Sequence, residues 1–292
     1  MSPRKGLRVI SLNTDFWFFV NFFNYIHSEN PGFSGMLRFL TDELFRAEKN
    51  GERVRIIGHV ETGWDGKNSM YKPTELFYHI VSRFAPHTIA AIFLGHAHED
   101  HFEVFYRATH PSTTKVKRNT MNAVAPAFIV PSVTTYQKNV NPSFRVMKVD
   151  PDTYDVYDVD QYYTPVTEFD KLKGRHVHHG PAWRHLYSAR SAYSNFSGCA
   201  HKDTYDAPVR LENGWWPKNV PINGPFWDAL TDEIEARTDL ATTFSIYKGR
   251  QSPKTKVCDS MDCAKHVACY MRSGSKAQGS KCGGNYGTVA RS

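Results

Sequence analysis

Three histidines in the sequence have the chemistry and the spacing of metal ligands. Each follows a short apolar run and a glycine: His59 follows residues 54–57, and His96 and His98 follow residues 89–94. We expect both runs to be buried strands, and glycine permits a sharp exit from a strand and a close approach to an ion. A hydrolytic metal site needs several ligands from separate strand ends and one position left open for water. The pattern therefore predicts that these three imidazoles bind metal.

The elements that would position the histidines alternate along the chain. Residues 7–13 alternate enough to form a strand, and residues 33–49 have the apolar spacing of an amphipathic helix. A second helix begins at Pro73 and ends near Pro86, so strand–helix–strand units carry both histidine segments. Four later runs are predicted to be strands of a mainly antiparallel sheet, namely 102–106, 124–130, 144–149 and 154–159. The expected fold class is α/β (α+β).

The character of the sequence changes near residue 163. Prolines, aromatic residues and helices predicted at 183–193 and 226–238 replace the strands, and a tail rich in Ser, Gly and Lys begins at residue 273. We therefore divide the chain into residues 1–162 and 163–292. The cluster of histidines at 176–179 has no carboxylate or cysteine partners nearby, so we expect an exposed loop rather than a metal site.

Composition limits the classes of partner. The 292 residues are 40% hydrophobic and 14% aromatic, which is enough to bury a sizeable core. The net charge of +7 favours anionic partners such as phosphate esters or an acidic membrane surface. The basic residues are scattered, so we expect no nucleic-acid binding.

No apolar run reaches membrane-spanning length, and the first residues do not resemble a signal peptide. The densest apolar patch, residues 16–23, is interrupted by Asn21. We expect it to be a packed loop or helix of the core, with a lipid-facing groove as the alternative.

Several motifs follow one another in an order typical of a single enzyme family. They are residues 6–13, the Gly-His at the end of 55–59, the Gly-His-Ala-His that opens 95–106, and residues 125–136 and 141–146. With these motifs, residues 6 to about 160 resemble the second half of the calcineurin-like metallophosphoesterase domain of acid sphingomyelinases and acid sphingomyelinase-like phosphodiesterases. The resemblance implies half of a β-sandwich flanked by helices, followed by a helical C-terminal region with disulfides.

The resemblance also implies roles for particular residues. In that family two zinc ions lie side by side, with manganese or iron not excluded. His59 and His96 match ligands of the second ion, His98 matches a ligand of the first, and Tyr136 matches a tyrosine near the substrate phosphate. The implied reaction is hydrolysis of a sphingomyelin-like phospholipid phosphodiester by metal-bound hydroxide. Peripheral membrane contact and a secreted or vacuolar-lysosomal location are further implications.

Three motifs of that family do not occur in this sequence: an Asp-x-His pair, a Gly-Asp-x-x-Asp and a Gly-Asn-His-Glu. Three histidines divided between two metals should hold zinc weakly, so we expect little or no catalysis by this chain alone. The chain reads as though it had been cut, or its gene model begun, inside the fold. Two alternatives stay open: a non-catalytic binding or interaction module, and a phosphoesterase that acts on nucleotides or polyphosphate.

The cysteines support the same resemblance. Four lie near the C-terminus, with a spacing like that of the acid sphingomyelinases: Cys258, Cys263, Cys269 and Cys282. By likeness, the first pairs with the second and the third with the fourth. A zinc knuckle is the alternative, but the gaps form no paired Cys-x-x-Cys units. Cys199 is left over, and Asn195 begins an Asn-Phe-Ser sequence that could accept a glycan in the secretory route.

Overall fold

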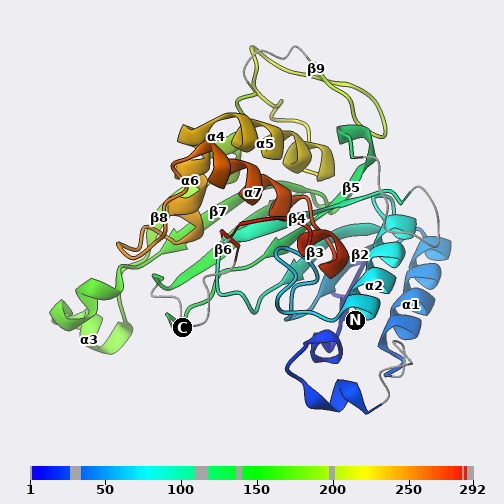
Figure 1. Cartoon of the computed structure of the whole chain (residues 1–292), viewed down its shortest axis with the longest axis horizontal. Coiled ribbons are helices and arrows are strands. Elements are labelled where there is room, and N and C mark those ends of the chain that lie inside the picture. The colour runs from blue at the N-terminus through cyan, green and yellow to red at the C-terminus, as the bar shows by residue number, and fades with distance from the viewer. Residues whose placement is uncertain are drawn as a thin grey trace.

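The computed structural model describes residues 2–26, 34–108, 118–135, 140–196, 201–284 and 286–287. A five-stranded sheet forms its centre, with the strand order β1-β2-β3-β5-β4 (Figure 1). Its strands are β1 (Leu7–Ser11), β2 (Arg53–Ile57), β3 (Ile89–Leu94), β4 (His101–Tyr106) and β5 (Ala123–Ile129). The predicted mixed α/β fold class is confirmed.

The first four strands in the spatial order are parallel, and β4 at the edge is antiparallel to β5. The four strands predicted after the histidines pair antiparallel, β4 with β5 and β6 (Ser143–Val149) with β7 (Val156–Tyr163), as expected, but they lie in two sheets and β5 also pairs parallel to β3. The reason lies in the path of the chain. It runs from β3 out to the edge strand β4 and returns through β5 between the two, so β5 is parallel to one neighbour and antiparallel to the other.

Two helices cover one face of this sheet, α1 (Met36–Asn50) and α2 (Tyr71–Phe84). Figure 1 shows them side by side next to β2 and β3. Their apolar residues recur at helical spacing and pack on alternate residues of the strands, as amphipathic helices do. α1 ends at Gly51, which has φ +65° and donates its N–H to the carbonyl groups of Ala47 and Glu48.

The opposite face packs against a second sheet and the C-terminal helices. A three-stranded antiparallel sheet has the order β6-β7-β8. The elements of this layer are β6 (Ser143–Val149), β7 (Val156–Tyr163), β8 (Arg184–Ser188), α4 (Ala189–Tyr193), α5 (Gly224–Ala236), α6 (Thr238–Lys248) and α7 (Met261–Met271). They share one hydrophobic core with β4 and β5.

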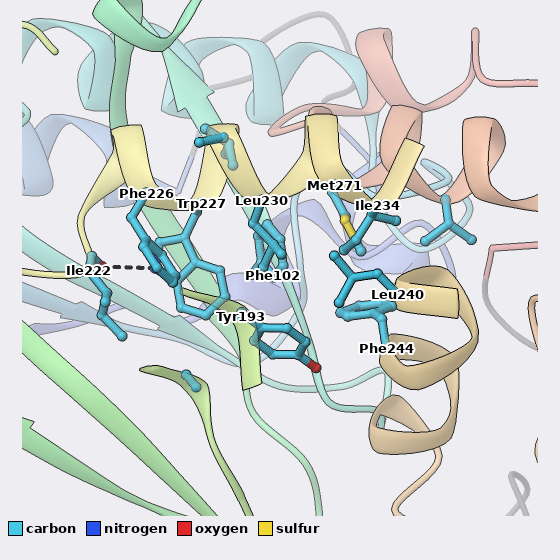
Figure 2. Packing of buried hydrophobic residues seen from close by; sticks show 14 of the residues in the cluster. Phe102, Tyr193, Ile222, Phe226, Trp227, Leu230, Ile234, Leu240, Phe244 and Met271 are labelled. Carbon is cyan, nitrogen blue, oxygen red and sulfur yellow. Dashed lines mark hydrogen bonds between the residues drawn. The ribbon is translucent and has the colours of Figure 1, made fainter. Parts of the chain in front are cut away.

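The centre of that core is an aromatic cluster beneath α5 (Figure 2). Trp227 on α5 packs against Phe102 on β4, with ring centroids 4.5 Å apart, and donates its indole N–H to the carbonyl of Ile222 at 2.8 Å. Phe244 on α6 lies 6.1 Å from Phe102, again between ring centroids. The C-terminal helices are therefore built into the same core as the central sheet.

The remaining elements are short. They are the 3₁₀ helices η1 (Thr14–Trp17), η2 (Phe22–Tyr25), η3 (Thr120–Asn122) and η4 (Val166–Lys171), the helices α3 (Arg175–His179) and α8 (Lys276–Gly279), and the strands β9 (His201–Lys202) and β10 (Val209–Arg210). No helix among the described residues is both long and apolar enough to cross a lipid bilayer.

The helix predicted over 183–193 is wrong in its first half. Residues 184–188 form β8, which pairs with β7, and only 189–193 are helical. The edge of β7 supplies backbone partners that the local apolar spacing does not reveal, so tertiary pairing overrides the helical pattern. The helix predicted over 226–238 is confirmed as α5, whereas α6 and α7 were missed.

Both disulfides implied by the resemblance are confirmed, Cys258–Cys263 and Cys269–Cys282. The zinc-knuckle alternative is therefore wrong for these four cysteines. The division of the chain at residue 162 stays a prediction, although β7 runs across that point and pairs with β8 beyond it.

Candidate metal-binding site at the sheet edge

His59 and His96 meet at one edge of the central sheet. Nδ1 of His96 lies 3.3 Å from Nε2 of His59, and the two ring planes are perpendicular with centroids 5.1 Å apart. His59 is exposed to solvent and His96 is half-buried. The rings of Phe18 and His96 meet in a T-shaped contact with 4.7 Å between centroids. The pair is therefore open to solvent on one side and covered by an aromatic ring on another.

The sheet explains why two residues far apart in sequence come together. β2 and β3 are parallel neighbours, with Ile57 opposite Phe93, so the segments after them leave from the same edge. The N–H of Gly95 then donates to the carbonyl of His59 at 2.7 Å. The prediction that the two strand ends present their histidines together is confirmed for His59 and His96.

The glycine before His59 has a steric role. A Cβ atom at Gly58 would lie 2.6 Å from the Cγ2 atom of Thr14. With no side chain in the way, Thr14 Oγ1 accepts hydrogen bonds from the N–H groups of His59 at 2.8 Å and Val60 at 2.7 Å. The close approach at this glycine is thus to a neighbouring side chain, which holds the backbone of His59.

The donor set of the pair fits a zinc ion. Two nitrogens that each lie about 2.0–2.1 Å from a tetrahedral zinc ion are about 3.3–3.4 Å apart, and the spacing between His59 and His96 matches that value. Imidazole nitrogen also suits iron, copper and nickel. Two imidazoles occupy only part of a tetrahedral shell, which leaves positions for further ligands and for water.

His98 lies on the same turn and is half-buried, but it does not complete a set of three. Among the residues that the structure describes, no group of three or more His, Cys, Asp or Glu side chains is arranged to hold a metal ion. The resemblance gives His98 to the other ion of a pair, so its role as a ligand stays a prediction. The identity of the metal stays a prediction as well.

Ion pairs anchor the chain directly after the histidines. Glu99 and Asp100 are both buried. Nζ of Lys248 lies 3.3 Å from Oε2 of Glu99, and the buried Arg145 forms an ion pair with Asp100. The hydroxyl of Tyr187 donates a further hydrogen bond of 2.9 Å to Asp100. These contacts offset the charge of the buried carboxylates and fix the segment that follows His98.

A buried carboxyl group lies further along β4. Glu103 is completely buried and accepts hydrogen bonds from the N–H of Gly63 at 3.1 Å and the hydroxyl of Thr62 at 3.3 Å. Burial raises the pKa of Glu103 well above its usual range, and the nearby Glu61 raises it further. Its side chain joins β4 to the segment that follows His59.

Comparison with known proteins identifies the family. No family model matches the sequence. The chain is 36% identical over 219 residues to the sphingomyelin phosphodiesterases of Bos taurus and Homo sapiens, which covers 74% of this chain and 30% and 29% of those proteins. It is 28% identical over 272 residues to sphingomyelin phosphodiesterase B of Dictyostelium discoideum, which covers 92% of this chain and 37% of that protein.

The chain belongs to the acid sphingomyelinase-like family. It spans about a third of the length of the curated relatives it matches.

Several other residues of this acid sphingomyelinase-like chain were singled out in the sequence but are not part of the His59–His96 pair. Tyr136 and Cys199 lie outside the described residues. Asn195 is exposed and forms an isolated β-bridge with Trp215, and its glycosylation stays a prediction. The cluster at 176–179 forms the short helix α3 rather than the expected loop, although the expected exposure is confirmed for the side chains of 177–179.

The apolar patch at 16–23, which was expected to pack in the core, is buried in one part and exposed in another. Trp17 is completely buried and donates its indole N–H to the carbonyl of Val60 at 3.0 Å, so it belongs to the core. Phe22 and Phe23 are 79% and 56% exposed. The core interpretation therefore holds for the start of the patch and fails at its end.

Sequence reasoning missed the residues that support the histidines from a distance. Phe18, Lys248 and Arg250 all contact the histidine segments or the residues next to them. An aromatic residue near the site was visible in the dense patch, but no local signal marked Lys248 or Arg250. Lys248 and Arg250 meet the histidine segment through contacts between residues about 150 positions apart in this acid sphingomyelinase-like chain.

Proposed function

We propose that this chain supplies histidine ligands to a metal-dependent phosphodiesterase centre of the acid sphingomyelinase type. The observation that carries the proposal is the pair of imidazole nitrogens 3.3 Å apart, from His59 and His96, at the edge of the sheet. When bound there, a zinc ion supplies Lewis-acid polarisation of a phosphoryl oxygen and lowers the pKa of water. The names of the relatives favour a phospholipid phosphodiester such as sphingomyelin as the substrate.

The role of the chain's own residues is to bind and orient. His59 and His96 would hold one ion, and His98 would serve a second. We propose that the remaining ligands and the general acid come from outside these 292 residues, because the sequence contains no Gly-Asn-His-Glu or Gly-Asp-x-x-Asp. The chain alone should therefore turn over little or no substrate.

An exposed aromatic segment near the histidines favours contact with a lipid surface. Phe22, Phe23, Tyr25 and Ile26 are between 50% and 79% exposed. Asn24 holds this segment in place, since its side-chain amide donates to the carbonyl groups of Asp15 at 2.9 Å and Phe18 at 3.0 Å. Aromatic side chains suit the boundary between lipid headgroups and acyl chains. We propose peripheral membrane contact through this segment, with a secreted or vacuolar-lysosomal location.

Metal analysis of the purified chain tests the ligand assignment. The wild-type chain and a His59→Ala, His96→Ala double variant are loaded with zinc, dialysed and analysed by mass spectrometry. We expect the variant to retain at least several-fold less zinc, because each imidazole supplies one metal–ligand bond. His185→Ala is the control, since His185 lies on β8 beside Asp160. Equal zinc in the wild type and the double variant would remove the assignment.

The same preparations test the expected inactivity. Zinc-loaded wild-type chain is incubated with sphingomyelin vesicles, and released phosphocholine is measured against the double variant. We expect the two to be equal. Turnover that needs both zinc and the two histidines would show instead that the chain forms a complete centre.

A further inference from the structure

A buried arginine from the C-terminal part of the chain bonds to the backbone of the histidine turn. Arg250 is completely buried. Its Nη1 donates to the carbonyl oxygen of His98 at 2.6 Å, and its Nε donates to the carbonyl oxygen of Asn141 at 2.6 Å. The amide of Asn141 returns a hydrogen bond of 2.8 Å to the carbonyl of Arg250. The guanidinium thus joins two segments that are far from it in sequence.

We propose that Arg250 is a positioning residue, which fixes the His96-Ala97-His98 turn in the conformation that presents its imidazoles to metal. The inference rests on the proposed metal-binding role of those histidines. It goes beyond that role by assigning the geometry of the turn to a residue that touches neither metal nor substrate.

The turn needs support because both of its histidines have unfavourable backbone conformations. His96 has φ +67° and His98 has φ +56°, in the left-handed region that residues with a Cβ atom rarely adopt. Such a conformation is energetically costly and persists only where surrounding contacts hold it. Within the turn, the N–H of Ala97 donates to the carbonyl of Gly95 at 2.7 Å. Arg250 supplies the contact from outside, at the carbonyl of His98.

The stability of the core does not explain a guanidinium at this position. The charge of Glu99 favours the protonated Arg250, but its Nη2 has no hydrogen-bond partner among the described residues. Desolvation lowers the pKa of Arg250 to about 10, so burial of the charge has a cost. Apolar replacement of buried charged groups is often neutral or stabilising. The planar, forked donors of arginine do match the need to bond two carbonyl groups at once.

Lys248, two positions before Arg250, contacts the next two residues after His98. Nζ of Lys248 lies 3.3 Å from Oε2 of Glu99, and the carbonyl of Lys248 accepts the N–H of Asp100 at 3.3 Å. The Lys248 ammonium also lies 5.1 Å from the centroid of the Trp64 ring. Residues 98, 99 and 100 are therefore each held by the segment 248–250, which begins at the last residue of α6. The C-terminal helices thereby become part of the histidine site.

Cobalt binding and the imidazole NMR signals test the inference on the full 292-residue chain. In Arg250→Met we expect the dissociation constant for Co²⁺, read from its visible absorption, to rise at least ten-fold. We also expect the ¹H–¹⁵N signals of the His96 and His98 rings to shift or broaden without any metal. If the Met variant does not fold, Arg250→Lys is measured in the same way, because lysine keeps the charge and loses the forked donors.

Arg190→Met is the matched control. Arg190 also donates to backbone carbonyl groups, those of Tyr157, Pro217 and Val220, but not to the histidine turn. We expect this variant to lose stability while Co²⁺ affinity and ring signals stay unchanged. A folded Arg250 variant with wild-type affinity and wild-type ring signals would overturn the inference. If the wild type binds no Co²⁺, the proposed function loses its support, and the ring signals of the metal-free chain still decide the role of Arg250.

Discussion

Glu103 has a buried carboxyl group whose protonation should set part of the pH dependence of stability. The hydrogen bonds from Gly63 and Thr62 do not offset the cost of removing an ionised carboxylate from water. The single hydroxyl proton of Thr62 can go to the carbonyl of Gly274 at 2.9 Å, and the hydroxyl oxygen then accepts a hydrogen bond from the protonated Glu103. The neutral acid therefore suits this position better than the carboxylate.

We predict that Glu103→Gln flattens the pH dependence of stability. The folded-state pKa is raised, so the contribution of Glu103 is fully present below its ordinary pKa, about 4.3, and is lost as pH rises toward the folded value. The Gln variant keeps a neutral donor and acceptor at every pH. Thermal melts from pH 4 to 7.5 should show the variant gaining stability relative to wild type as pH rises. Exposed Glu212→Gln is the control, and a difference that is the same at every pH would contradict the prediction.

The residues of the candidate site differ in how far the sequence could predict them. Two strand ends with Gly-His predicted that His59 and His96 would come together, because parallel neighbours deliver their ends to one edge. The bond from Arg250 to His98 joins residues 152 positions apart. No local sequence pattern predicts a contact between residues so far apart, because the contact forms only when these two parts of the chain pack together.

At the scale of elements, regular amphipathic segments were predicted well and segments fixed by pairing were not. α1, α2 and α5 have apolar faces that a helical period reveals. β8 is decided by its neighbour β7, and β5 takes its direction from the two strands on either side of it. A signal for α7 was present but not used: Ser260, whose side chain accepts the N–H of Cys263, is a typical N-terminal cap.

The Cys269–Cys282 disulfide joins the end of α7 to the segment after α8, and its loss should cost more than loss of Cys258–Cys263. The sequence separations are 13 and 5 residues, and the larger loop loses more chain entropy on closure. Loop entropy alone gives about 3 kcal/mol of stabilisation for Cys269–Cys282 and about 2 kcal/mol for Cys258–Cys263. Urea unfolding of the two double Cys→Ser variants measures both, and an inverse order would show that native packing dominates over loop length.

At the scale of the whole molecule, the C-terminal part of the chain contacts the segments that follow the strands carrying His59 and His96. Trp64, in the segment after His59, donates its backbone N–H to the carbonyl of Ser273 at 3.0 Å. In Figure 1 the dark blue segment that holds η1 and η2 projects from the body of the molecule, away from α5, α6 and α7. The exposed aromatic residues are therefore on a part of the molecule that the C-terminal helices do not cover.

This arrangement predicts that lipid binding depends on residues 22–26 and on charge. The double variant Phe22→Ser, Phe23→Ser should bind vesicles of phosphatidylcholine and phosphatidylserine at least ten-fold more weakly in co-sedimentation, since it removes apolar surface that would leave water. Wild-type binding should weaken as salt rises, because the net charge of +7 attracts anionic lipid through screened electrostatics.

Met261→Ser is the control for the vesicle measurement, since Met261 is 43% exposed and lies on α7. If the control weakens binding as much as the double variant does, general surface hydrophobicity explains the association. If the double variant binds like wild type while salt still releases the protein, charge alone is responsible. The aromatic segment would then have no part in membrane contact, because side chains that enter the headgroup region must contribute to affinity.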